Sequence, residues 1–217
     1  MQNPHRDQPL TFSGAAIAGA PLVVVAVHGR TLDPTYMIDN VVTRLNRPDL
    51  AYVLPAADGN SWYPASFLAP LEQNQPRLDF ALARLDDVLQ VIGDAGVDDS
   101  RVVWLGFSQG ACLVTEYVAR SNRRFAALIC LTGGLIGPDA DNLTRPAQAK
   151  GLPTFITLSD HDEWIPLGRA EKTASIFLDA GADVEFVVTK DTAHEVVDDA
   201  IARTRSLLNE LSPAPAA

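Results

Sequence analysis

Cysteine and long hydrophobic runs are both scarce in this sequence. The 217 residues include two cysteines, Cys112 and Cys130, and each lies in an apolar segment that predicts a small buried thiol rather than a disulfide. The first eight residues are polar, and no apolar signal region follows them. The apolar stretch 15–27 is interrupted by Gly19 and Pro21 and is too short to span a bilayer. We therefore expect a cytoplasmic protein without stable membrane insertion.

Positive charge is also in short supply. Lysine and arginine number 17 against 27 aspartates and glutamates, which gives a formal net charge of −10. Nucleic acids and anionic membrane surfaces repel such a protein. These partners are therefore not expected, and a small molecule is the expected ligand.

What the chain has is enough apolar residues for a sizeable core. It is 47% hydrophobic and 20% charged, which is typical of globular proteins. The length suits one domain, and no internal repeat divides it. We expect a single domain over residues 1–217, with flexible tails at 1–10 and 212–217.

Buried strands and amphipathic helices alternate along the chain. This alternation predicts a mostly parallel sheet with helices on both faces, which binds ligands at the carboxyl ends of its strands. No insertion is long enough for a large cap domain. The strands are expected at 22–27, 51–54, 102–107, 126–131, 154–158 and 184–189, and the helices at 34–46, 76–92, 111–119, 169–180 and 195–211.

The most informative stretch is residues 106–110, which read Gly-Phe-Ser-Gln-Gly. It joins a predicted strand to a predicted helix. A serine between two glycines at such a junction is typical of the nucleophile elbow of α/β-hydrolases. Side chains at the two glycines would collide with the neighbouring strand and helix. We therefore predict that Ser108 is a catalytic nucleophile.

The matching base is expected after Ser108, because the order in this fold is serine, acid, histidine. His194 follows the strand predicted at 184–189 and precedes the last helix, so we predict that it is the base. His161 is interpreted as a loop neighbour of the acid.

The acid is expected in the loop 159–166, where it would accept a hydrogen bond from the His194 ring and stabilise the imidazolium. This loop contains three carboxylates, and spacing does not choose among Asp160, Asp162 and Glu163.

An oxyanion hole requires two backbone N–H groups near the nucleophile. The first is expected from Gln109, the residue after the serine. The second is expected from the loop after the first strong strand, where Gly29 permits a close approach and Arg30 supplies the N–H. His28, just before this glycine, is predicted to orient the loop rather than to act in catalysis.

Several motifs between His28 and His194 are shared with one known family. The most specific is Gly-Phe-Ser-Gln-Gly-Ala at 106–111, and shorter matches lie at 27–29, 61–63, 132–134, 160–166 and 193–194. In these segments the chain resembles the phospholipase/carboxylesterase group of small α/β-hydrolases, which includes the acyl-protein thioesterases. The resemblance implies an α/β-hydrolase fold and hydrolysis of carboxylic esters and thioesters, without a metal or an organic cofactor. It also implies that Asp162 is the acid, because the family's acid lies four residues before the proline.

The chain departs from the family pattern at three places. Thr31 stands where the oxyanion loop often has a second glycine, and Ser159 stands where the acid loop usually has glycine. Residues 63–68 differ from the thioesterase-like continuation, which indicates a bacterial-type esterase subgroup.

The substrate pocket is predicted from apolar residues in loops near the serine. Their character favours small, fairly apolar substrates cleaved through an acyl-enzyme on Ser108. A non-catalytic binding or scaffold protein and a dienelactone-hydrolase-like enzyme remain as alternatives. The loop with aromatic residues around 61–63 is compatible with a homodimer. The predicted pocket residues are Trp62, Leu68, Leu135, Ile136, Trp164 and Ile165.

Overall fold

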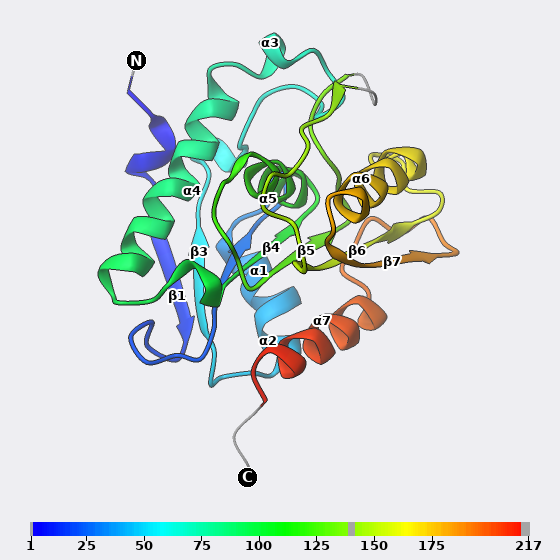
Figure 1. The fold of residues 1–217 in the computed structure, drawn as a ribbon. Helices are drawn as coiled ribbons and strands as arrows, with labels where there is room; N and C mark the ends of the chain where they lie inside the picture. Colours follow the sequence, from blue (N-terminus) through cyan, green and yellow to red (C-terminus); the bar gives the residue numbers. More distant parts are fainter. Residues whose placement is uncertain (1, 139–141, 214–217) are drawn as a thin grey trace.

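The computed structural model describes residues 2–138 and 142–213, which form a seven-stranded sheet with helices on both faces (Figure 1). The strand order is β1-β3-β2-β4-β5-β6-β7. Strand β1 is antiparallel to β3, and the other neighbouring strands are parallel. The strands are β1 (Leu10–Gly14), β2 (Val23–Val27), β3 (Ala51–Pro55), β4 (Val102–Phe107), β5 (Ala127–Leu131), β6 (Pro153–Ser159) and β7 (Asp183–Thr189).

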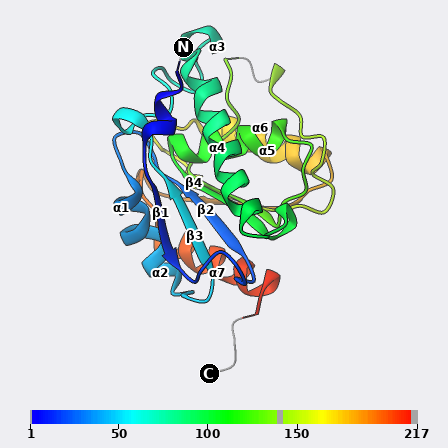
Figure 2. The same ribbon diagram turned by 90° about the vertical axis from the view of Figure 1, so that its left-hand side faces the viewer.

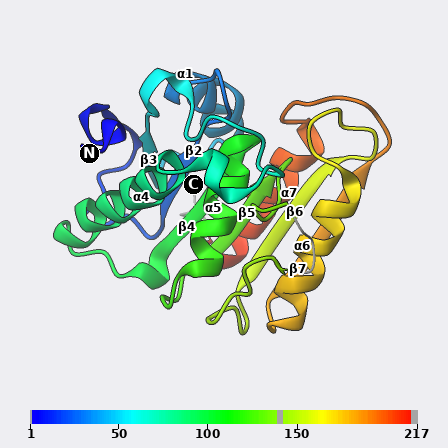
Figure 3. The same ribbon diagram turned by 90° about the horizontal axis from the view of Figure 1, so that it is seen from above.

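Helices α4, α5 and α6 lie over one face of the sheet, and α1, α2 and α7 lie over the other (Figures 1 and 3). The helices are α1 (Pro34–Met37), α2 (Thr43–Leu45), α3 (Leu71–Asn74), α4 (Arg77–Asp94), α5 (Gln109–Arg120), α6 (Leu167–Asp179) and α7 (Asp198–Leu211). Four short helical segments complete the set: η1 (Pro4–Asp7), η2 (Ile38–Val42), η3 (Asp58–Asn60) and η4 (Asp99–Arg101).

The expected α/β-hydrolase architecture is confirmed, and each predicted strand is present. Strand β1, which runs along the edge of the sheet (Figure 2), was not predicted. Its pattern is weak because an edge strand with one solvated face needs few apolar residues. Phe12 in β1 is 55% exposed, which shows how little of this strand enters the core.

The helix expected at 34–46 is less regular than its sequence predicts. Asp33 caps its start, because the Asp33 carboxylate accepts a hydrogen bond from the N–H of Tyr36 at 3.0 Å. The middle of the segment widens into a π-helical turn, η2, before α2 ends at Asn46 in the left-handed conformation. The last helix begins at Asp198 rather than 195, so residues 190–197 form a loop at the end of β7.

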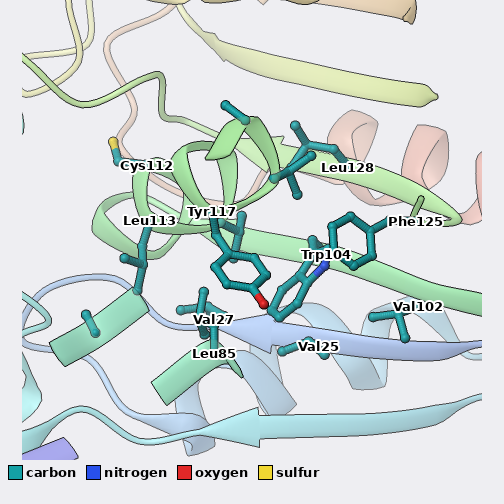
Figure 4. Packing of buried hydrophobic residues seen from close by; sticks show 14 of the residues in the cluster. Val25, Val27, Leu85, Val102, Trp104, Cys112, Leu113, Tyr117, Phe125 and Leu128 are labelled. Atoms are coloured by element: carbon teal, nitrogen blue, oxygen red, sulfur yellow. The ribbon is translucent and has the colours of Figure 1, made fainter. Parts of the chain in front are cut away.

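An aromatic cluster fills the space between β4 and α5. The ring of Trp104 packs against Tyr117 and Phe125, with ring centroids 4.7 and 5.7 Å apart (Figure 4). Val25 and Leu128 from the neighbouring strands belong to the same core. Aromatic pairs in these tilted and edge-on arrangements contribute about 0.5–1.5 kcal/mol beyond their buried area. This packing holds α5, the helix that begins beside Ser108, against strand β4.

Both cysteines are buried and free, as the sequence predicts. Cys112 lies in α5 and Cys130 in β5. Among the described residues, no helix is long and apolar enough to cross a membrane.

Residues 2–10, the described part of the expected N-terminal tail, include a segment that packs against the domain. His5 in η1 is fully buried, donates a hydrogen bond to the carbonyl of Trp62, and accepts one from the N–H of Asp58. These partners are far away in the sequence, so local composition did not reveal them. At the other end, the carbonyl of Ser212 accepts a hydrogen bond from Arg47 at 3.0 Å. The rest of the predicted C-terminal tail, residues 214–217, lies outside the described residues.

Candidate active site

Ser108 lies in a strained turn between β4 and α5. Its φ of 54° and ψ of −120° place a non-glycine residue in a sparsely populated conformation. A Cβ on Gly106 would lie 2.4 Å from the carbonyl oxygen of Gly110, and a Cβ on Gly110 would lie 2.2 Å from that of Val27. Any other residue at these two positions would force the strand and helix apart. The tightly packed turn therefore holds Ser108 in this backbone conformation.

His194 lies between Ser108 and Asp162. The Ser108 hydroxyl is 2.8 Å from Nε2 of the histidine, and Nδ1 is 2.7 Å from Oδ2 of Asp162. The Asp162 side chain is fully buried, so it accepts the Nδ1 proton and selects the tautomer whose Nε2 can accept the serine proton. These three side chains come from loops after β4, β6 and β7.

The second oxygen of Asp162 is also engaged. Oδ1 accepts hydrogen bonds from the backbone N–H groups of Trp164 and Ile165, both at 2.8 Å. These bonds leave the carboxylate a single orientation, in which Oδ2 faces His194.

The other carboxylates of this loop point elsewhere. Asp160 contacts Nδ1 of His161 at 2.8 Å, and the His161 side chain is 75% exposed. Glu163 is exposed. The geometry therefore joins Asp162 to His194 and leaves His161 as a solvated neighbour.

The loop that follows β2 approaches Ser108 closely. A Cβ on Gly29 would lie 3.1 Å from the Cβ of Ser108, so a side chain at this position would crowd the serine. The next residue is Arg30, and the first residue of α5 is Gln109. The N–H of Gln109 has no acceptor within the helix, because the first N–H groups of a helix have none. Both predicted oxyanion donors thus lie on segments that flank the serine.

The side chains of these two residues have a role that the sequence did not reveal. The Arg30 guanidinium donates to the carbonyls of Tyr63, Pro64 and Ala65. The Gln109 amide accepts from the N–H of Trp62 and donates to the carbonyl of Tyr63. Both side chains therefore tie the loop at 62–65 to the segments beside Ser108.

His28 orients the loop that follows β2, as expected. It is fully buried, its Nδ1 is 2.7 Å from the carbonyl of Gly29, and its Nε2 accepts from the N–H of Ala57 at 3.1 Å. Burial lowers the pKa of His28 and keeps the ring neutral. The ring contacts backbone groups on both sides and therefore fixes the loop.

A cavity of about 500 Å³ opens beside Ser108. Trp164 and Ile165 line it, as predicted, whereas Trp62, Leu68, Leu135 and Ile136 are not among its lining residues. The sequence missed most of the wall, which comes from segments distant along the chain. The lining residues are Arg30, Thr31, Leu32, Tyr36, Tyr63, Ser66, Phe67, Phe107, Ser108, Gln109, Cys112, Trp164, Ile165 and His194.

The predicted pocket residues outside the lining serve as packing. Trp62 is fully buried, and its indole N–H donates to the carbonyl of His28 at 2.9 Å. Leu135 and Ile136 are buried and belong to the main core cluster, against which Leu68 also packs. Apolar character does not distinguish a wall facing a cavity from a side chain beneath it.

The cavity wall carries little free charge. Among the residues that the structure describes, no lysine, aspartate or glutamate lines the cavity, and the Arg30 guanidinium is occupied by three carbonyls. Burial raises the pKa of the Cys112 thiol well above its ordinary value, so the thiol stays protonated. The wall therefore suits an uncharged ligand. Within residues 2–138 and 142–213, no group of three or more histidine, cysteine, aspartate or glutamate side chains is arranged to hold a metal.

The two departures in the loops have structural consequences. Thr31 adopts a φ of 66°, and its N–H donates to the carbonyl of Asn60 at 2.8 Å. Ser159 is buried, and its hydroxyl donates to the carbonyl of Ala193, the residue before His194.

The model of the phospholipase/carboxylesterase family matches residues 23–212. The chain belongs to this family. The match spans the sheet from β2 to β7 and includes the loops that carry Ser108, Asp162 and His194. This membership makes the chain a carboxylesterase-type hydrolase.

Solved structures agree with this assignment. A phospholipase/carboxylesterase from Dyadobacter fermentans is 35% identical, with a TM-score of 0.86 over 93% of this chain and 96% of the other. The esterase PE8 is 22% identical, with a TM-score of 0.73 over 94% of this chain and 99% of that one. A carboxylesterase from Bacillus cereus is 13% identical, with a TM-score of 0.74 over 97% and 100%. The last two show the shared fold alone. No curated protein sequence matches the chain.

Proposed function

We propose that this family member is a serine hydrolase that cleaves carboxylic esters or thioesters through an acyl-enzyme on Ser108. The observation that carries the proposal is the contact of His194 with both Ser108 and Asp162, at 2.8 and 2.7 Å. A histidine that bridges a hydroxyl and a buried carboxylate is the arrangement that activates a serine. Neither a scaffold nor a binding protein requires it.

Acylation follows from this geometry. His194 accepts the hydroxyl proton through Nε2 while the Ser108 oxygen attacks the acyl carbon. Asp162 stabilises the imidazolium that forms, and its two backbone donors keep it from turning away. The imidazolium then gives the proton to the leaving alcohol or thiol. Water, deprotonated by His194, releases the acid in the second half of the reaction.

The backbone N–H groups of Arg30 and Gln109 would bind the oxyanion. Gln109 opens helix α5, whose N-terminus favours negative charge. Loss of one oxyanion donor costs on the order of 10²–10³ in rate.

The cavity sets the expected substrate. Its volume of about 500 Å³ suits a small molecule, and its wall is largely apolar and aromatic. Trp164 is 63% exposed although it lines the cavity, so its ring is available to an apolar acyl or alcohol group. We therefore propose small, uncharged, fairly apolar esters or thioesters as substrates.

The test combines a substrate series with a nucleophile variant. Oxygen esters and thioesters of matched acyl length are assayed with the wild type, with Ser108→Ala, and with Ser206→Ala on the exposed face of α7 as the control. We expect turnover to vanish in Ser108→Ala alone, with unchanged thermal unfolding. A Ser108→Ala variant with near-normal turnover would refute the proposal.

A fluorophosphonate probe separates the alternatives. It should label the wild type at Ser108, whereas a non-catalytic binding protein should not react. A dienelactone-hydrolase-like enzyme typically has a cysteine nucleophile, whereas the elbow here carries Ser108. If Cys112, which lines the cavity, acted as the nucleophile instead, Cys112→Ala would abolish activity. Under the present proposal Cys112→Ala keeps the labelling, because the buried thiol is protonated.

A further inference from the structure

Ser159 lies at the end of the sheet where two loops begin. One loop carries Asp162, and the other carries His194. This serine is the last residue of β6 and pairs with Thr189, the last residue of β7. Ser159 is buried, with only 3% of its surface exposed. A buried hydroxyl is stabilised by hydrogen bonds to protein groups. Its partners therefore show what it holds in place.

The hydroxyl of Ser159 reaches the histidine loop. It donates a hydrogen bond to the carbonyl of Ala193 at 2.5 Å. Asp191 in the same loop accepts the N–H of Ala193 at 2.9 Å. Both backbone groups of Ala193 are therefore held, and Ser159 is the residue that connects them to β6.

The backbone of Ser159 reaches the acid loop. Its carbonyl accepts the N–H of Asp162 at 3.4 Å. One residue thus contacts Asp162 through its main chain and the neighbour of His194 through its side chain. Glycine at this position would keep the first contact and lose the second.

We propose that Ser159 is a positioning residue that sets the His194 ring relative to Asp162 and Ser108. The Ala193 carbonyl and the His194 ring are adjacent points on one loop, and both are tied to the β6 end of the sheet. The N–H of His161 also donates to the carbonyl of Asp191, but the Ser159 bond is the contact made by the residue next to His194, so it restrains the direction in which the ring projects. A shift of about 1 Å in a reacting group can cost on the order of 10²-fold in rate. This inference rests on the proposed function of the same three residues.

The effect should fall on kcat and not on KM. Ser159 does not line the cavity, so its loss alters the position of the reacting His194 ring and leaves the rest of the cavity wall unchanged. We expect kcat to fall roughly ten-fold in Ser159→Ala and in Ser159→Gly, with KM within about twofold of the wild type. Ser159→Thr keeps the hydroxyl and should restore most of kcat.

Thr154→Val is the matched control. Thr154 lies in the same strand, is equally buried, and donates its hydroxyl to the carbonyl of Leu152 at 3.1 Å. The substitution therefore removes a comparable hydrogen bond at the opposite end of β6. It should lower the free energy of unfolding as much as Ser159→Ala does, with kcat unchanged.

A second readout needs no substrate. The NMR resonance of the His194 Nδ1 proton reports its hydrogen bond to Asp162. It should broaden or shift in Ser159→Ala, return in Ser159→Thr, and stay in place in Thr154→Val. The positioning role is refuted if Ser159→Ala keeps the wild-type kcat and resonance, or if Thr154→Val changes both equally. If the wild type cleaves no ester or thioester while the resonance still responds to Ser159, the proposed function fails and the positioning role stands.

Discussion

The side chains of Arg30 and Gln109 donate hydrogen bonds to one acceptor, the carbonyl oxygen of Tyr63, at 2.9 and 2.8 Å. Ser61 donates to the same oxygen at 3.0 Å. The two residues proposed to bind the oxyanion through their N–H groups are thus connected through their side chains. The loop at 62–65 acts as a brace between the segment after β2 and the start of α5.

This brace predicts a loss of activity when a side chain is removed and its backbone donor stays. Gln109→Ala should lower kcat/KM about ten-fold, less than the 10²–10³ lost with a whole donor. Arg30→Met should act similarly. The double variant should lose less than the product of the two, because residues that share an acceptor are coupled.

Steady-state kinetics on one short ester measures these effects. Gln90→Ala is the control, since its amide hydrogen-bonds Asp94 on the exposed face of α4. Full additivity of the two losses would contradict the shared brace.

Thr31 predicts a gain in substrate range when its side chain is removed. It lines the cavity in a left-handed conformation that costs a β-branched residue about 1–2 kcal/mol. Thr31→Gly should relieve this strain and widen the cavity, so the kcat/KM ratio of branched to linear acyl esters should rise several-fold. Thr31→Val keeps the width and should leave the ratio unchanged. An equal ratio in all three proteins would show that Thr31 does not limit the substrate.

Glu116 predicts a large loss of stability. Its fully buried carboxylate accepts hydrogen bonds from Arg120, from the N–H of Ile136 and from the hydroxyl of Thr144. Each buried donor left unpaired costs about 1–3 kcal/mol, so Glu116→Ala should lower the free energy of unfolding by about that much or more. Glu116→Gln keeps an acceptor and should cost less. Urea denaturation measures the difference, and equal losses would indicate that packing alone matters.

His5 predicts a loss of stability in mild acid. Burial lowers its pKa from 6.5 to about 4, and the nearby Arg77 adds to the shift. Between these values the unfolded chain binds a proton that the folded chain does not, so stability falls as pH drops from 6.5 to 4. The contribution is on the order of 3 kcal/mol when each pKa unit is worth about 1.4 kcal/mol.

His5→Gln removes this titration. The free energy of unfolding, measured by urea denaturation between pH 7 and 4, should therefore vary less in the variant. The buried His28 contributes a dependence of the same sign in both proteins. A variant with the same slope as the wild type would contradict the role of His5.

The sequence by itself determined the elements whose signals are local. The apolar runs of β2, β4 and β5 predict their strands because a strand covered on both faces needs apolar residues throughout. Ser108 was predicted for the same reason, because both glycines of its motif lie within two residues of it. Strand β1 and the contacts of His5 were not predicted because their partners lie far away in the sequence.

Tertiary structure alone decided which side chains meet. Spacing did not distinguish the three carboxylates of one loop, and only the family resemblance favoured Asp162. In the structure Asp162 contacts His194, whereas Asp160 contacts His161. The same holds for the cavity wall, since Tyr36, Phe67 and Phe107 converge from separate segments while Leu135 packs in the core. Local patterns record whether a residue is buried, but the register of the parallel strands and the loops at their carboxyl ends determine what it faces.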